Sequence, residues 1–109
     1  MKIIYNEFIP FKNFIAINLF GILFVRKEYK DRGLGKNIIN HEEIHTAQIK
    51  EMGYVFFYIW YAVEWIVRLC IDYRTAYRNI SFEKEAYSNE YNLHYLEGRR
   101  HYSWIKYLK

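Results

Sequence analysis

Two histidines lie four residues apart in the run His41-Glu42-Glu43-Ile44-His45. On a helix, residues i and i+4 lie one turn apart on the same face, so both imidazoles can reach one metal ion. Neutral imidazole nitrogen is a common ligand of Zn²⁺. A glutamate directly after the first histidine can take a proton from a metal-bound water as that water attacks a carbonyl. The run therefore predicts a zinc site at His41 and His45, with Glu42 as the catalytic base.

Two histidines and a water leave one protein ligand to be identified. No third histidine follows at short spacing, so a carboxylate from another helix is favoured. The candidates elsewhere in the chain are His94, His101, Asp72, Glu64, Glu83, Glu85 and Glu90. The same donor set would also suit Fe²⁺, Mn²⁺ or Ni²⁺. The alternative interpretation is that both histidines lie on the surface of an ordinary helix and bind nothing.

The elements that must position these residues are predicted from turn signals and apolar periodicity. The predicted strands are 2–5, 14–19 and 22–27, and the predicted helices are 37–52, 54–72, 81–97 and a short one at 101–108. Phe20-Gly21 predicts a tight hairpin, and residues 30–36 predict a loop. We expect one α+β domain over residues 1–109. A small antiparallel sheet should pack on the helix that carries the histidines, with two further long helices completing the core.

Three stretches resemble, in this order, the gluzincin group of zinc metallopeptidases: AINLFGILFVR, NIINHEEIHTAQ and FEKEAY. More narrowly, the chain is similar to small uncharacterised bacterial zincin-like proteins. This resemblance implies a minimal zincin-like metallopeptidase that hydrolyses peptide bonds, with Glu83 as the third ligand. It also implies that strand 22–27 pairs with an extended peptide substrate. Tyr87 departs from the pattern, because an acid or amide usually follows the alanine at position 86.

The faces of the predicted third helix also distinguish Glu83 from its rival Glu85. Glu83 shares a polar face with Tyr87, Glu90, Tyr91 and His94. Glu85 shares a face with residues suited to the core: Phe82, Ala86, Asn89, Leu93 and Leu96. We therefore favour Glu83 as the ligand. His94 and Tyr91, followed by Tyr87, are candidates to stabilise charge on the substrate oxygen in the transition state.

Residues 54–71 form an apolar run with only two charges, Glu64 and Arg68. A single crossing of the bilayer would put the histidines and Glu83 on opposite sides, which no shared metal site allows. The charges at 64, 68 and 72 lie four apart and should pair along one stripe. We therefore expect a core helix, and the alternative is an in-plane helix at a membrane surface.

Composition limits the remaining functions. The chain has 12 Tyr, 21% aromatic residues and a formal net charge of +4. Its basic residues form no stripe of the kind that binds nucleic acid. One cysteine, Cys70, suggests no disulfide and is expected in the core, and no signal peptide is evident, so we expect a cytoplasmic protein that could associate with membranes.

Two other functions stay open beside a metallopeptidase acting on peptides or proteins. The first is a zinc-binding domain without peptidase activity, which would act in binding or regulation. The second is a membrane-peripheral interaction protein in which the histidine motif is accidental. The aromatic surface also makes an oligomer plausible.

Overall fold

A hairpin with a tight turn supplies two of the three strands of the sheet. The computed structural model describes residues 2–8, 15–30 and 33–108. Within it, β2 (Ala16–Leu19) pairs antiparallel with β3 (Ile22–Arg26). Phe20 and Gly21 between them have φ angles of 55° and 89°. Positive φ at both central positions is what a type I′ turn requires, so the predicted hairpin is confirmed. Residue 14 of the predicted strand and residues 31–32 of the predicted loop lie outside the described residues.

The third strand makes the sheet mixed. β1 (Lys2–Asn6) pairs parallel with β3, and the strand order is β1-β3-β2. The expectation of a purely antiparallel sheet is therefore wrong for β1. The expectation that strand 22–27 offers a free edge is also wrong, because β3 has a neighbour on each side. The edge that faces the helices belongs to β2, which contacts the first helix.

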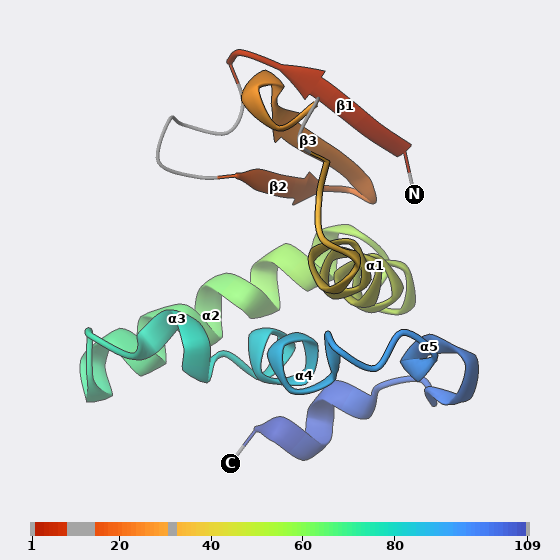
Figure 1. Cartoon of the computed structure of the whole chain (residues 1–109). Helices are drawn as coiled ribbons and strands as arrows, with labels where there is room; N and C mark the ends of the chain where they lie inside the picture. The colour runs from red at the N-terminus through yellow and green to blue at the C-terminus, as the bar shows by residue number, and fades with distance from the viewer. Residues whose placement is uncertain (1, 9–14, 31–32, 109) are drawn as a thin grey trace.

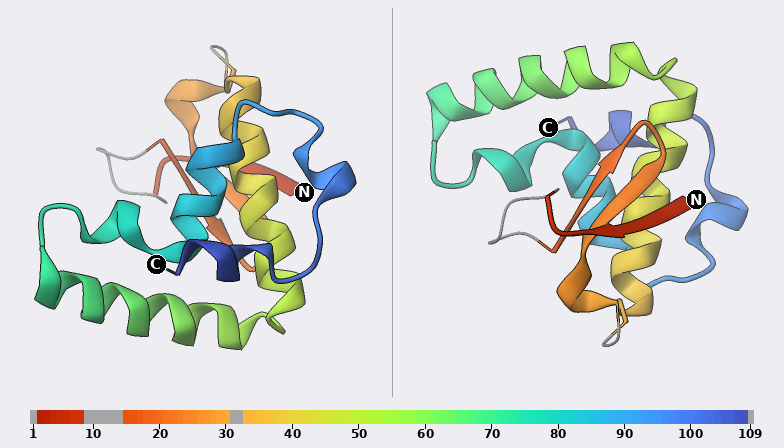
Figure 2. Two further views of the ribbon diagram at one scale, coloured as in Figure 1. Left: turned by 90° about the horizontal axis from the view of Figure 1, so that it is seen from below. Right: turned by 90° about the horizontal axis from the view of Figure 1, so that it is seen from above.

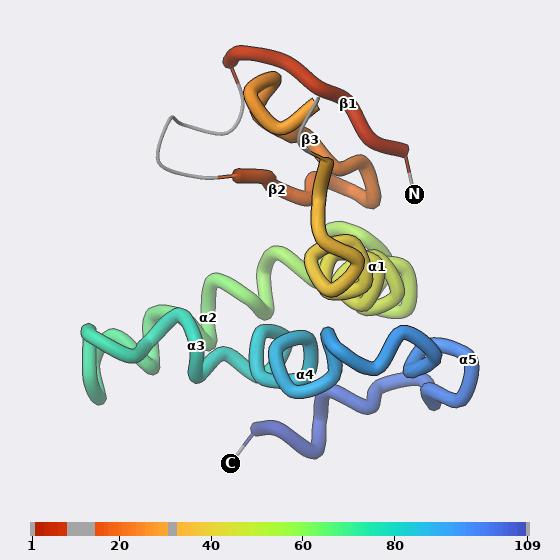
Figure 3. The backbone as a smooth tube through the Cα atoms, viewed as in Figure 1, coloured from red at the N-terminus to blue at the C-terminus, as the bar shows by residue number. Residues whose placement is uncertain are grey.

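The rest of the chain is helical and stacks beneath the sheet. The helices are α1 (Lys36–Glu51), α2 (Val55–Ile71), α3 (Ala76–Asn79), α4 (Ser81–Asn89) and α5 (Tyr95–Gly98), with short 3₁₀ turns η1 (Lys27–Tyr29) and η2 (Ser103–Tyr107). Figure 1 shows the layers, with the sheet above α1, then α4, and then η2. The tube in Figure 3 shows how the chain returns through α3 and α4 to pass beneath α1. The described chain is thus a small α+β domain, as expected.

The predicted helix over 81–97 is interrupted, and Asn40 on α1 supplies a physical reason. Its amide nitrogen lies 3.2, 2.8 and 3.0 Å from the backbone oxygens of Asn89, Glu90 and Asn92. Carbonyls at a helix end need partners from outside the helix, and this amide provides one. α4 therefore ends at Asn89, and the chain resumes as the short helix α5 at Tyr95.

The buried core lies where α1, α2, α4 and η2 meet. Its members are Ile49, Phe57, Ile80, Phe82 and Trp104. Glu64 joins this region by accepting hydrogen bonds from the backbone nitrogen and the hydroxyl of Ser81. It thereby satisfies free donors at the start of α4. Arg68 instead donates to the backbone oxygen of Leu108. The expected pairing of Glu64 with Arg68 is therefore replaced by contacts to other elements.

α2 packs against the domain through one narrow face only. Phe57 and Glu64 are its buried residues, and most of its other side chains are exposed. The expectation of a core helix is therefore wrong, and Cys70 is exposed rather than buried. Figure 2 shows α2 running along one side of the domain. Among the described residues no single helix is long and apolar enough to cross a membrane. Of the described helices, only α1 and α2 taken together are long and apolar enough, and the chain bends by 111° at their junction.

Candidate metal centre

Three buried side chains from two helices converge at one point. His41 and His45 come from successive turns of α1, and Glu83 comes from the first turn of α4. The Nε2 atoms of the two histidines are 3.1 Å apart. Glu83 Oε1 lies 3.3 Å from His41 Nε2 and 3.1 Å from His45 Nε2. This cluster of three could hold a metal ion. The two histidines of α1 and the glutamate of the later helix therefore lie together, as we expected from the sequence.

The other ring nitrogen of each histidine is already engaged. His41 Nδ1 lies 3.0 Å from Glu90 Oε1, and His45 Nδ1 lies 2.8 Å from Gln48 Oε1. An ionised carboxylate only accepts hydrogen bonds, so His41 must donate from Nδ1. Histidines that bind metals typically donate their second N–H to an acceptor of this kind, which leaves the other nitrogen free to coordinate. The chemistry of the cluster therefore fits a cation.

Gln48 fixes the orientation of His45. Its amide nitrogen lies 3.1 Å from the backbone oxygen of Phe82 and 2.9 Å from Glu85 Oε1. Both atoms are acceptors, so the amide cannot be reversed without placing oxygen against oxygen. Gln48 Oε1 therefore faces His45, and His45 donates from Nδ1. These contacts make Gln48 a residue that supports the histidine and does not itself face the point where the three ligand atoms meet.

We predict that Gln48→Ala weakens metal binding roughly 10–100-fold, the usual cost of losing a partner of a metal-binding histidine. Competition with a chromogenic chelator measures the dissociation constant. The matched control is Asn89→Ala, because the Asn89 amide donates to Glu85 O and Tyr107 Oη and contacts no member of the cluster. Equal effects of the two substitutions would show that Gln48 acts through general stability alone.

The rival ligand Glu85 belongs to a different group of charges. Arg99 donates to Glu85 from Nε at 2.6 Å and also binds Glu51 at 2.7 Å. Tyr95 donates to the same carboxylate at 2.6 Å. These partners, with Gln48, account for both oxygens of Glu85. The structure therefore places Glu85 behind the cluster, where it holds Gln48, and Glu83 alone of the two acids faces the histidines.

In the metal-free cluster, the neighbouring charges stabilise a proton on His45. Burial lowers the pKa of the His45 imidazole, but the Glu83 carboxylate opposes this more strongly, and the pKa rises to about 9. Burial alone would raise the pKa of the Glu83 carboxyl. The positive charge of His45 and the close approach of both histidine rings outweigh it, so this pKa lies far below its ordinary value. The pair therefore exists as imidazolium and carboxylate near neutral pH.

A cavity of about 680 Å³ opens beside the cluster. His45, Glu83 and Glu42 line it, together with residues of β2 and α2. The backbone oxygen of Glu42 accepts from the Asn18 amide at 2.9 Å, which ties α1 to the edge strand β2. Burial raises the pKa of the Glu42 carboxyl, the largest influence on that group. A carboxylate with a raised pKa is a better proton acceptor, as general base chemistry requires.

The structure does not bring the two predicted transition-state stabilisers to the cavity. The Tyr91 side chain is 79% exposed, and His94 pairs with Glu97 on the surface at 3.1 Å. Both follow the break after α4, where the chain no longer has the helical face on which their placement depended. His101 is also exposed, with Nδ1 3.5 Å from Glu51 Oε2.

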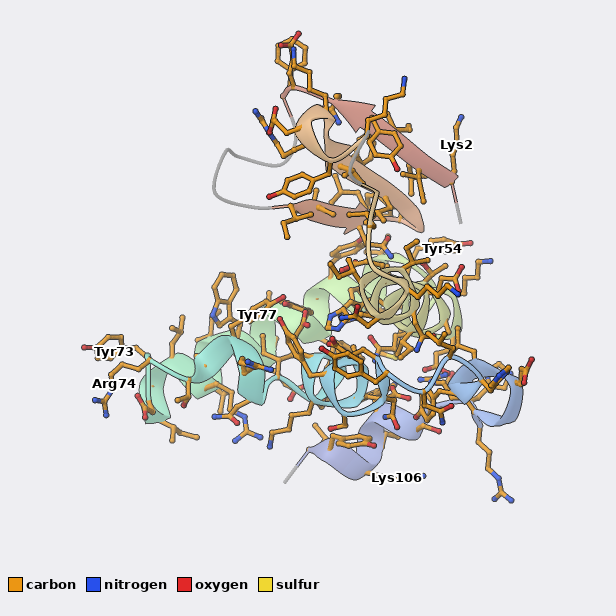
Figure 4. All side chains as sticks on the ribbon, in the orientation of Figure 1. Lys2, Tyr54, Tyr73, Arg74, Tyr77 and Lys106 are labelled. Atoms are coloured by element: carbon orange, nitrogen blue, oxygen red, sulfur yellow. The ribbon has the colours of Figure 1, made fainter. Side chains whose placement is uncertain are left out.

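One tyrosine from α2 and one from α3 lie near the cluster instead, and no sequence pattern distinguished them from the ten other tyrosines. Tyr61 donates to Glu83 Oε2 at 2.8 Å. Tyr77 lines the cavity and is hydrogen bonded to Tyr61 and Tyr87. Figure 4 shows Tyr77 directed toward the region where α1 and α4 meet. Burial raises the pKa values of Tyr61 and Tyr77 well above the ordinary range, so both hydroxyls stay protonated.

Tyr87 supports His41 by packing rather than by a hydrogen bond. The two rings meet edge to face with centroids 4.5 Å apart, and the Arg78 guanidinium lies 4.0 Å from the centroid of the Tyr87 ring. The carboxylate that orients His41 comes from Glu90, which Asn37 also contacts at 3.0 Å. Glu90, three residues beyond Tyr87, is thus the acid that contacts the His41 ring on this side.

No model of a protein family, no curated protein and no solved structure matches this chain significantly.

Proposed function

We propose that this protein is a zinc-dependent metallopeptidase of the zincin type. His41, His45 and Glu83 would hold the ion, and Glu42 would serve as general base. The observation that carries the proposal is the convergence of three buried ligand atoms within 3.1–3.3 Å of one another, directly beside a cavity that Glu42 also lines. A site with only a structural purpose would need neither the cavity nor the fourth residue.

The spacing within the cluster supports zinc in particular. Two ligands about 2.0–2.1 Å from a tetrahedral ion lie roughly 3.3 Å from each other. The separations among His41, His45 and Glu83 are 3.1–3.3 Å, so an ion at their centre requires little movement of any side chain. Three protein ligands would leave the fourth position open, which is the arrangement of catalytic rather than structural zinc.

Bound zinc would supply an acidified water and polarise a substrate carbonyl. The residues of the chain would do the rest. Glu42 would accept the proton of the attacking water and pass it to the leaving amine, a role that suits its raised pKa. Tyr77 would donate a hydrogen bond to the substrate oxygen, in place of Tyr91 and His94. Tyr61 would keep Glu83 in position through the bond to its second oxygen.

The cavity also limits the substrate. Apart from the polar group at its floor, its lining is largely aliphatic and aromatic, and it includes Ile17, Leu19, Ile49, Phe57 and Trp65. Among the described residues that line it, the carboxylates belong to Glu42 and Glu83, and both would repel an acidic side chain. We therefore propose a peptide with a bulky apolar side chain, aligned along β2, which is an edge strand of the sheet in the described part of the chain.

The test is digestion of a mixed peptide library by the zinc-loaded protein, with the products identified by mass spectrometry. We expect cleavage next to aliphatic or aromatic residues, stopped by a chelator and restored by zinc. Cleavage that persists in the chelator would point to a contaminating enzyme. A zinc-loaded protein that cleaves no peptide in the library would overturn the proposed activity and leave a zinc-binding domain.

Zinc affinity should depend on pH, because zinc must displace the proton held by His45. Since the pKa of His45 is about 9 in the free site, the protonated form dominates at neutral pH and competes with zinc. We expect affinity to rise about tenfold for each pH unit between pH 7 and 9 and to level off above. Competition with a chelator of known pH dependence measures this. Constant affinity over that interval would contradict the assigned proton.

A further inference from the structure

α2 presents an uncharged surface to solvent along its whole length. We call this surface the outer face of α2, and its members are Val55, Phe56, Ile59, Ala62, Val63, Ile66, Val67, Leu69 and Cys70. The seven larger aliphatic and aromatic members are 43–65% exposed. The two charged residues of the helix, Glu64 and Arg68, lie on the opposite, packed side. Monomeric soluble proteins rarely expose a contiguous apolar patch beyond a few hundred Å².

We propose that the outer face of α2 docks in the interfacial layer of an anionic lipid membrane, with the helix axis parallel to the surface. At 17 residues the helix is about 25 Å long. Helices that lie in the plane of a membrane combine one apolar face with aromatic and basic residues at its margins. The outer face meets the first condition, because no charged side chain interrupts it.

The margins meet the second condition. By helical geometry Trp60 and Trp65 lie on the two sides of the outer face. Tyr54 and Tyr73 lie just before and just after the helix, and both are exposed. Figure 4 shows Tyr73 projecting at one extremity of the molecule. Tryptophan and tyrosine favour the headgroup layer. Exposed Lys50 lies close to the start of the helix, and the formal net charge of +4 favours anionic lipid.

A lipid surface fits the outer face better than a second protein chain does. Interfaces between proteins carry about one hydrogen bond per 100–200 Å². The outer face offers no polar group except the thiol of Cys70, so it could contribute almost none of these bonds. Acyl chains require no such bonds.

Docking would also bring substrate and site together. Trp65 is 44% exposed and also lines the cavity beside the metal cluster. A docked α2 would therefore place that side of the cavity near the membrane surface. Peptide segments that emerge from the bilayer would then be within reach.

The experiment is flotation of the full chain with vesicles of phosphatidylcholine and phosphatidylglycerol at a ratio of about 3:1. We expect the wild type and the His45→Ala variant to float equally, because the outer face does not depend on the metal cluster. The double variant Val63→Glu with Ile66→Glu should lose about tenfold or more in vesicle partitioning, while its zinc content stays at that of the wild type. The matched control, Tyr91→Glu with Leu93→Glu, adds the same charge at exposed positions away from α2 and should float normally.

A second readout uses the single cysteine. An environment-sensitive fluorophore on Cys70 should shift its emission to shorter wavelength when vesicles are added to the otherwise unchanged chain. The proposal is overturned if the wild type does not float and the label does not shift. It is also overturned if light scattering shows a stable dimer that the Val63/Ile66 variant dissociates, because a second copy then covers the face. Neither result would affect the proposed zinc chemistry, which metal content tests separately.

Discussion

Replacing His45 or Glu83 by alanine is expected to lower zinc affinity by roughly a hundred- to a thousandfold. Apparent binding free energies of about 10–16 kcal/mol for zinc held by four ligands imply a few kcal/mol for each ligand. Both side chains are buried and face the same point, so no surface residue can take their place. The dissociation constants are measured by competition with a chelator at fixed pH.

The matched control for the histidine is His94→Ala, which removes the same side chain from a solvent-exposed position. Its zinc affinity should equal that of the wild type. The proposed ligand set is wrong if His94→Ala weakens zinc binding as much as His45→Ala does. It is also wrong if Glu83→Ala binds zinc normally, because the ligands would then lie elsewhere.

The second large effect is expected for Glu42→Gln, which should reduce kcat roughly 10²–10⁴-fold. Glutamine keeps the size and polarity of the side chain but cannot accept the proton of the attacking water at neutral pH. Zinc content and KM should change little, because Glu42 is not one of the three proposed ligands. Initial rates on the best library peptide measure the effect.

Glu43→Gln is the control for this substitution, since it makes the same chemical change one residue away on α1, at a side chain that does not line the cavity. It should retain the activity of the wild type. If Glu42→Gln is as active as Glu43→Gln, Glu42 is not the base, and the chemistry must be assigned to another group.

The spacing of the two histidines and the hairpin turn could be predicted from the sequence, because each depends only on residues that are close together in the chain. Residues i and i+4 on α1 share a face whatever the rest of the chain does, so His41 and His45 had to point the same way. The two-residue turn at Phe20-Gly21 likewise follows from short-range backbone preferences. Glu83 was harder to identify, and its choice depended on the resemblance and on the polar character of one helical face.

Residues that depend on distant contacts could not be predicted in this way. Asn40 of α1 binds the backbone of residues about 50 positions away, and the end of α4 that it accompanies removes Tyr91 and His94 from the expected face. Tyr61 and Tyr77 reach the cluster only through the packing of α2 and α3. The exposure of α2 could not be predicted, because an apolar run has the same sequence pattern whether a protein core or another apolar phase covers the helix.

The most direct test of the central claim is zinc titration of the chelator-treated wild-type chain, followed by mass spectrometry under non-denaturing conditions. We expect one zinc ion per chain, bound with release of protons and retained through buffer exchange. If the folded, metal-free chain binds no zinc at any concentration up to the millimolar range, the proposed zinc site is wrong. The convergence of His41, His45 and Glu83 would then be a buried ion pair and not a metal site.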